Sequence, residues 1–118
     1  MSMKTKIYHN PRCSKSRQTL QLLTDNNIEP EIVKYLESPP TQSELKEILD
    51  LLGKQPQDII RFKDKVAKEL GISARDERSA AEWIELMVKN PALIERPIVV
   101  VGGKAVLGRP PEAVLEII

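Results

Sequence analysis

The residues most able to carry out chemistry lie in one short segment around Cys13, the only cysteine of the chain. We expect this thiol at the start of a helix, where unpaired backbone N–H groups and the positive end of the helix dipole favour the thiolate. Arg12, Lys15 and Arg17 add positive charge nearby. The same amides and cations would bind an oxyanion. The segment therefore predicts a nucleophile and an anion cradle together.

A lone cysteine is more commonly a small, inert core residue. The neighbours of Cys13 are polar and charged, and no apolar periodicity includes it, so we favour the reactive interpretation. Ser16 occupies the position where a thioredoxin-like Cys-x-x-Cys motif has its second thiol. A disulfide or adduct on Cys13 would therefore need a thiol from another molecule for its resolution.

His9, four residues before Cys13, has two interpretations that the sequence leaves open. Its ring could end the first strand with a satisfied hydrogen bond. Alternatively, an imidazolium at this position could lower the pKa of the Cys13 thiol or hold a proton for a leaving group.

Three arginines stand out by context. Arg61 follows an apolar pair, Arg96 precedes Pro97 and an apolar run, and Arg109 lies between a glycine and a proline. The fork of a guanidinium matches an oxyanion, although a surface ion pair is the commoner role of a single arginine. Arg96 and Arg109 flank the two strands of one predicted hairpin, so these two can approach each other. Base rates favour a trans Arg96–Pro97 bond, but X–Pro bonds are where cis peptides occur.

Composition restricts the class of protein. The chain has 118 residues and a formal net charge of +1, which indicates one small domain without a field for nucleic acid or anionic membranes. A single cysteine fits a reducing cytosol, and one cysteine with one histidine is too few for a structural zinc site. Aromatic residues are 3% of the chain, and no apolar run is long enough to span a membrane. We therefore expect a cytoplasmic protein with no bound metal, no nucleic-acid partner and no membrane association.

The elements that position these residues are predicted by apolar periodicity and by turn signals. Residues 4–8 and 31–36 are expected to be strands on either side of a helix from residue 14 to about 26, which is a βαβ unit with parallel pairing. Residues 98–101 and 104–107 form a hairpin around Gly102-Gly103, followed by a helix from Pro110-Pro111. The order indicates an α/β architecture with a mixed sheet.

Between these parts lies a helical segment at about 41–90. Thr41-x-x-Glu44 and Ser79-x-x-Glu82 are capping boxes that begin helices, and shorter helices are expected at 56–62 and 65–70. The segment has no long flexible linker. We interpret it as an insertion packed on the sheet of a single domain, residues 1–118, rather than as a second domain.

Four separated motifs resemble the glutaredoxin-coupled arsenate reductase family. They are Ile7-Tyr8-His9-Asn10-Pro11-Arg12-Cys13-Ser14-x-Ser16-Arg17, Tyr35-Leu36-x-x-Pro39-Pro40, Arg96-Pro97-Ile98-Val99-Val100 and Gly108-Arg109-Pro110. They occur in order over nearly the whole chain. The resemblance implies a thioredoxin-like fold with an inserted helical part, and a cis proline at Pro97. The chain departs from characterised arsenate reductases at Ser14-Lys15, where smaller uncharged residues are usual. It is similar here to a subgroup of related proteins for which the native substrate is often undefined.

Carried over by position, the resemblance implies that Cys13 is the nucleophile, that His9 lowers its pKa, and that Arg61, Arg96 and Arg109 bind arsenate or a similar oxyanion. The implied reaction is attack of the thiolate on arsenate with loss of water. Glutathione, a co-substrate rather than a bound cofactor, then attacks and reduces arsenic, glutaredoxin removes the glutathione, and arsenite leaves.

A second function is compatible with the same fold. Spx-type regulators resemble this chain in fold and act as redox-sensing modules that bind RNA polymerase. Those regulators usually carry Cys-x-x-Cys, and Ser16 takes the second position here. A disulfide switch is therefore disfavoured, although glutathionylation of Cys13 is not.

Overall fold

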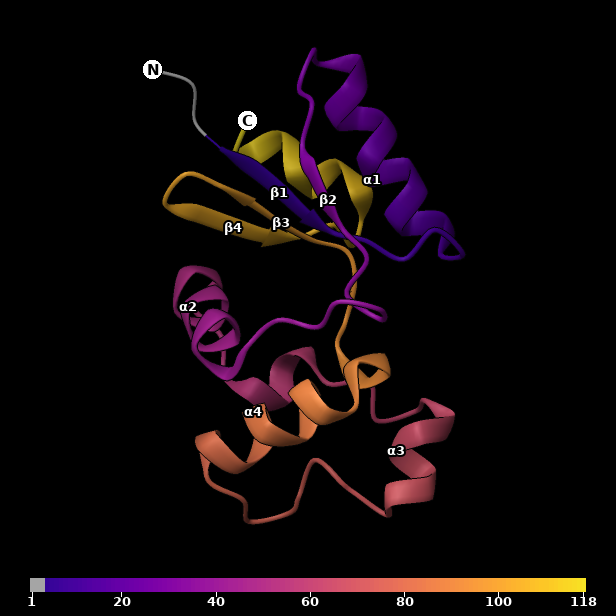
Figure 1. The fold of residues 1–118 in the computed structure, drawn as a ribbon, viewed down its shortest axis with the longest axis vertical. Helices are drawn as coiled ribbons and strands as arrows, with labels where there is room; N and C mark the ends of the chain where they lie inside the picture. Colours follow the sequence, from indigo (N-terminus) through magenta and orange to yellow (C-terminus); the bar gives the residue numbers. More distant parts are fainter. Residues whose placement is uncertain (1–3) are drawn as a thin grey trace. The chain divides into compact units, whose positions relative to one another are not determined.

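The fold is that of a computed structural model, which describes residues 4–118. In chain order the elements are β1 (Thr5–Tyr8), α1 (Ser14–Asp25), β2 (Glu31–Val33), α2 (Gln42–Leu52), the 3₁₀ segment η1 (Pro56–Ile59), α3 (Lys65–Leu70), α4 (Ala80–Lys89), η2 (Pro91–Leu93), β3 (Ile98–Val101), β4 (Lys104–Leu107) and η3 (Pro111–Glu116) (Figure 1). They form two compact units. Among the described residues, the sheet unit comprises residues 4–38 and Arg96–Ile118, and the helical unit comprises Pro39–Glu95.

The sheet unit is built on four strands in the order β2-β1-β3-β4. β1 pairs with β2 in parallel, and β1–β3 and β3–β4 are antiparallel. Ile7, at the centre of β1, lies opposite Ile32 on one side and Val99 on the other. The mixed sheet and the βαβ unit predicted from the sequence are confirmed.

The core of the sheet unit lies between one face of the sheet and two helical segments, α1 and η3 (Figure 1). Its fully or almost fully buried members are Ile7, Leu23, Val99, Val101 and Val114. Because alternate residues of a strand share a face, Val99 and Val101 point to the same side as Ile7. Burial of these side chains orients α1 on the sheet, and the start of α1 carries Cys13.

The helical unit contains α-helices at three of the four predicted positions, namely α2, α3 and α4. Both capping boxes are present, at Thr41–Glu44 and at Ser79–Glu82. In each, the hydroxyl accepts from the backbone N–H three residues on, and the carboxylate accepts in return. Helix α4 is held by apolar burial, because the ring of Trp83 is fully buried and lies perpendicular to the ring of Phe62 at a centroid distance of 5.8 Å.

Three elements differ from the sequence predictions. β2 ends at Val33 rather than at residue 36, because the chain turns there and the N–H groups of Glu37 and Ser38 both donate to the carbonyl of Lys34. The predicted helices after Gln55 and Pro110 are 3₁₀ segments. Each begins with proline, which has no backbone N–H to donate, and such short starts close with the tighter i→i+3 bonds.

The helical segment is slightly longer than the predicted insertion of about 41–90. It forms a compact unit with its own buried residues, which include Leu45, Ile59, Trp83 and Leu93. Its packing on the sheet stays a prediction. No helix within residues 4–118 is long and apolar enough to cross a membrane.

Candidate active site

Cys13 is the N-cap of α1, as predicted, and its side chain is half-buried. The turn that delivers it is closed by backbone bonds, since the N–H of Cys13 donates to the carbonyl of Asn10 at 3.0 Å. The Asn10 side-chain oxygen accepts from the N–H of Arg12. The carbonyl of Cys13 then accepts the first helical bond, from Arg17. Because the N-cap residue has extended backbone angles, its sulfur faces the free N–H groups of the first helical turn.

The pKa of the Cys13 thiol is lowered from its ordinary value. Burial by itself raises this pKa, but the backbone N–H of Ser16 and the side chain of Arg96 lower it by hydrogen bonding. The positive charge of Arg96 and the backbone N–H of Lys15 lower it further. These groups stabilise the thiolate, so the predicted helix-start effect is present and one predicted arginine lies at the sulfur.

Ser16 lies in the first turn of α1, three residues after Cys13, and is completely buried. Its hydroxyl oxygen is 2.6 Å from Nδ1 of His9 and accepts from the backbone N–H of Asn10 at 3.1 Å. Its backbone N–H donates a hydrogen bond to the sulfur of Cys13. One residue of the first helical turn therefore connects the end of β1 to Cys13.

The pKa of His9 is lowered by burial, and the nearby charges of Lys34 and Arg17 lower it further. The imidazole is accordingly neutral near pH 7, because its ordinary pKa is already about 6.5. Its backbone N–H donates to the carbonyl of Val33, and its ring bonds to Ser16. This geometry agrees with the interpretation of His9 as a satisfied residue at the strand end. It does not favour an imidazolium, and the effect of His9 on the thiol stays a prediction.

The two Arg–Pro segments of the sheet unit lie together. The Arg96–Pro97 bond is cis, as the resemblance implied and against the base-rate preference for trans. The Arg109–Pro110 bond is also cis, which the sequence did not predict. Nη1 of Arg109 donates to the backbone carbonyl of Arg96 at 3.0 Å. The predicted approach of Arg96 and Arg109 is therefore present. The side chain of Arg96 also hydrogen-bonds to the sulfur of Cys13.

Arg61 belongs to the helical unit. Its Nη1 lies 2.9 Å from Asp64 and its Nε lies 3.8 Å from Glu95. The Ile60–Ile94 bridge holds its backbone, and the Arg61 N–H donates to the carbonyl of Leu93. The two carboxylates were not predicted, although the three-residue spacing to Asp64 is one that places side chains together. The convergence of Arg61 with Cys13 stays a prediction.

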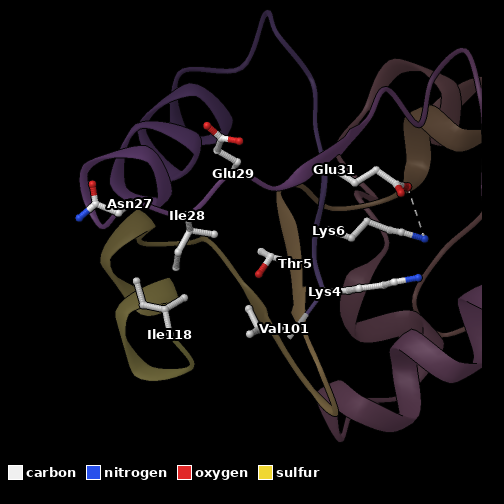
Figure 2. Close-up of a pocket in the computed structure, with 9 residues that line it drawn as sticks. All are labelled: Lys4, Thr5, Lys6, Asn27, Ile28, Glu29, Glu31, Val101 and Ile118. Carbon is white, nitrogen blue, oxygen red and sulfur yellow. Dashed lines mark ion pairs between the residues drawn. The ribbon is translucent and has the colours of Figure 1, made fainter. Parts of the chain in front are cut away.

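A pocket of about 710 Å³ lies at the other end of β1 from Cys13 (Figure 2). Its lining residues are Lys4, Thr5, Lys6, Asn27, Ile28, Glu29, Glu31, Val101 and Ile118. The only ion pair drawn there joins Lys6 to Glu31 at 3.7 Å, with Lys6 half-buried and Glu31 exposed. We find no group of three metal-binding side chains anywhere in residues 4–118.

Comparison with known proteins gives consistent matches. The model of the ArsC family matches residues 8–117. An arsenate reductase of Neisseria meningitidis serogroup B is 48% identical over 108 residues, covering 91% of this chain and 92% of that protein. YfgD of Escherichia coli is 51% identical over 119 aligned positions, covering 100% and 99%. The solved structure of an arsenate reductase from Vibrio cholerae covers 100% of both chains at 45% identity, with a TM-score of 0.93. The predicted α/β, thioredoxin-like fold is confirmed.

Proposed function

The chain belongs to the ArsC family, and on that premise we propose that it reduces arsenate to arsenite through the thiolate of Cys13, with glutathione and glutaredoxin as the source of electrons. The observation that carries the proposal is the position of the only thiol at the N-cap of α1, where two backbone N–H groups and Arg96 lower its pKa. A thiol whose thiolate form is favoured, beside a fixed cation, is the arrangement that attack on an oxyanion requires.

The first step joins sulfur to arsenic. The Cys13 thiolate supplies the electron pair of the new S–As bond, an As–O bond breaks, and that oxygen takes up protons and leaves as water. Arsenic remains As(V). Arg96 and Arg109 would neutralise the charge of the arsenate oxygens as the anionic thiolate approaches, because guanidinium stays protonated throughout the working pH range.

The second step reduces arsenic. A glutathione thiolate forms an S–S bond with Cys13 while the S–As bond breaks, and the electron pair of that bond remains on arsenic, which leaves as arsenite. The two sulfurs are thereby oxidised to a mixed disulfide. Glutaredoxin accepts the glutathione by thiol–disulfide exchange and releases the Cys13 thiolate.

Ser16 supports a resolving thiol from outside the chain. A second cysteine at this position would close an internal disulfide, but the position holds a buried hydroxyl bonded to His9 and Asn10. With no other cysteine in the sequence, the mixed disulfide can only be opened by another molecule. Glutathione supplies a small thiol that can reach a half-buried sulfur.

The test is arsenite formation by the purified protein with arsenate, glutathione and a glutaredoxin system. We expect turnover in the wild type and none in Cys13→Ser, which removes the nucleophile. Replacing glutaredoxin by thioredoxin distinguishes the electron donor, and we expect turnover to fall. Absence of arsenite with either donor would overturn arsenate reduction, and equal or better turnover with thioredoxin would overturn the glutathione route.

A further inference from the structure

We propose that Gly108 is a positioning residue of the Cys13 site, because the absence of a side chain there lets the end of β4 lie directly against α1 and Pro97. The proposal deepens the proposed function and rests on it for the role of Cys13. Gly108 follows Leu107, the last residue of β4, and is buried. Nothing in its own chemistry marks it as part of the site. Its importance lies in the space that it leaves empty.

The space at Gly108 is too small for any side chain. A Cβ on Gly108 would lie 2.5 Å from Oγ1 of Thr19 and 2.7 Å from Cγ of Pro97, and real Cβ atoms essentially never make contacts under 3.0 Å. The methyl carbon Cγ2 of Thr19 would lie 3.1 Å from the same Cβ. A methyl group would therefore force either α1 or the Arg96–Pro97 segment to move.

On one side, the contact reaches the turn that holds the thiolate. Thr19 is completely buried, and its hydroxyl donates to the carbonyl of Lys15 at 2.8 Å. This bond fixes the hydroxyl, which cannot rotate away from Gly108 without losing its partner. The backbone N–H of Lys15, in the same residue, is one of the groups that lower the pKa of Cys13. Displacement of Thr19 therefore acts on the first turn of α1.

On the other side, the contact reaches the arginines. The N–H of Gly108 donates to the carbonyl of Pro97 at 2.9 Å. The next residue, Arg109, donates from its guanidinium to the carbonyl of Arg96. Gly108 thus lies between the helix that carries Cys13 and the segment that carries Arg96, and the close approach sets the spacing between sulfur and guanidinium.

The backbone of Gly108 does not itself require glycine, because its φ lies outside the left-handed region. Alanine at this position is thus a test of space alone. Gly103, in the turn of the same hairpin, is the matched control. It too has φ outside that region, and a Cβ there would meet nothing within 4 Å.

The experiment measures the pH dependence of Cys13 alkylation by iodoacetamide in wild type, Gly108→Ala and Gly103→Ala, without arsenate. We expect Gly108→Ala to shift the profile to higher pH, with alkylation at a pH below the wild-type midpoint at least about threefold slower, because one pKa unit corresponds to a tenfold change in thiolate below the pKa. Gly103→Ala should follow the wild type. A folded Gly108→Ala with the wild-type profile would overturn the proposal.

If Gly108→Ala does not fold, the double variant Thr19→Ala/Gly108→Ala replaces it in the same alkylation measurement. This pair removes both Thr19 atoms that crowd the new Cβ and leaves the contact with Pro97. We expect a folded protein whose alkylation profile is still shifted to higher pH relative to Thr19→Ala alone, and coincident profiles would overturn the proposal. Because arsenate takes no part in these measurements, a failure of arsenate turnover is distinguished from a failure of positioning.

Discussion

The side-chain oxygen of Ser16 lies 2.6 Å from Nδ1 of His9, and both residues are buried. The position at which a Cys-x-x-Cys motif would carry its resolving thiol is thus occupied by a hydroxyl that supports the strand end before the nucleophile. The same hydroxyl accepts the N–H of Asn10, whose carbonyl closes the turn to Cys13. This position holds the Cys13 segment in place and carries a hydroxyl where a thiol would be needed for an internal disulfide.

Removal of the Ser16 hydroxyl should destabilise the protein. Ser16→Ala leaves Nδ1 of His9 and the N–H of Asn10 without this buried partner, and we expect a loss of about 1–3 kcal/mol in the free energy of unfolding, measured in urea. Thr24→Ala, on the exposed side of the same helix, removes a hydroxyl of the same kind that donates to Leu20. This control should change stability by less than about 0.5 kcal/mol. Equal losses in both variants would contradict the buried role of Ser16.

The Cys13 thiol should react below the pH at which an ordinary thiol does. Its lowered pKa means that the thiolate persists as the pH falls below the ordinary range and is lost only when the pH falls through the folded value. We expect the midpoint of alkylation to lie at lower pH in the folded protein than in the same protein in urea. In urea the helix is unfolded and Arg96 is no longer held near the sulfur. Arg96→Gln should raise the midpoint toward the unfolded one. Coincident folded and unfolded profiles would contradict the site.

The Arg109 guanidinium should matter for the oxyanion. Arg109→Ala removes a cation and the bond to the Arg96 carbonyl, and we expect the KM for arsenate to rise about tenfold, the effect of one charge-assisted hydrogen bond. Arg75→Ala removes an equal charge from an exposed arginine of the helical unit and should leave KM unchanged. The measurement is steady-state arsenite formation. An equal rise in KM for both variants would show that arsenate binding depends on net charge rather than on the position of Arg109.

His9 should make stability depend on pH in one window. Its pKa is lowered by burial and by nearby cations, so the unfolded chain binds a proton more readily than the folded one. The free energy of unfolding should therefore fall as the pH falls from about 6.5 to the folded pKa, and should be independent of His9 above that window. Since His9 is the only histidine, urea unfolding of wild type against His9→Gln isolates this slope. An opposite slope would indicate a histidine that is charged in the fold.

Arg61 tests the substrate role carried over from the family. Arg61→Gln should lower arsenite formation at least about tenfold if its guanidinium contacts arsenate. Asp64→Asn breaks the 2.9 Å ion pair but retains Arg61, and should have a much smaller effect on turnover. A loss of turnover that is larger in Asp64→Asn than in Arg61→Gln would show that Arg61 acts through the local fold of its unit.

Much of the fold was accessible from local signals. The capping boxes at Thr41 and Ser79, the break at Gly102-Gly103 and the apolar run before it each act over a few residues, and each is present where predicted. The ends of β2 and the 3₁₀ segments were less accessible, because they depend on which backbone groups find partners in the folded chain.

The sequence by itself determined that Cys13 is a lone thiol at a helix start, because a helix end, its free amides and the nearby cations are all encoded within a few residues. Only the tertiary structure decided which distant groups reach it. Arg96 lies 83 positions further along the chain than Cys13 and meets the sulfur because β3 pairs beside β1. Gly108 meets Thr19 because the hairpin returns against α1. Such contacts follow from strand pairing and core burial, which no short stretch of sequence contains.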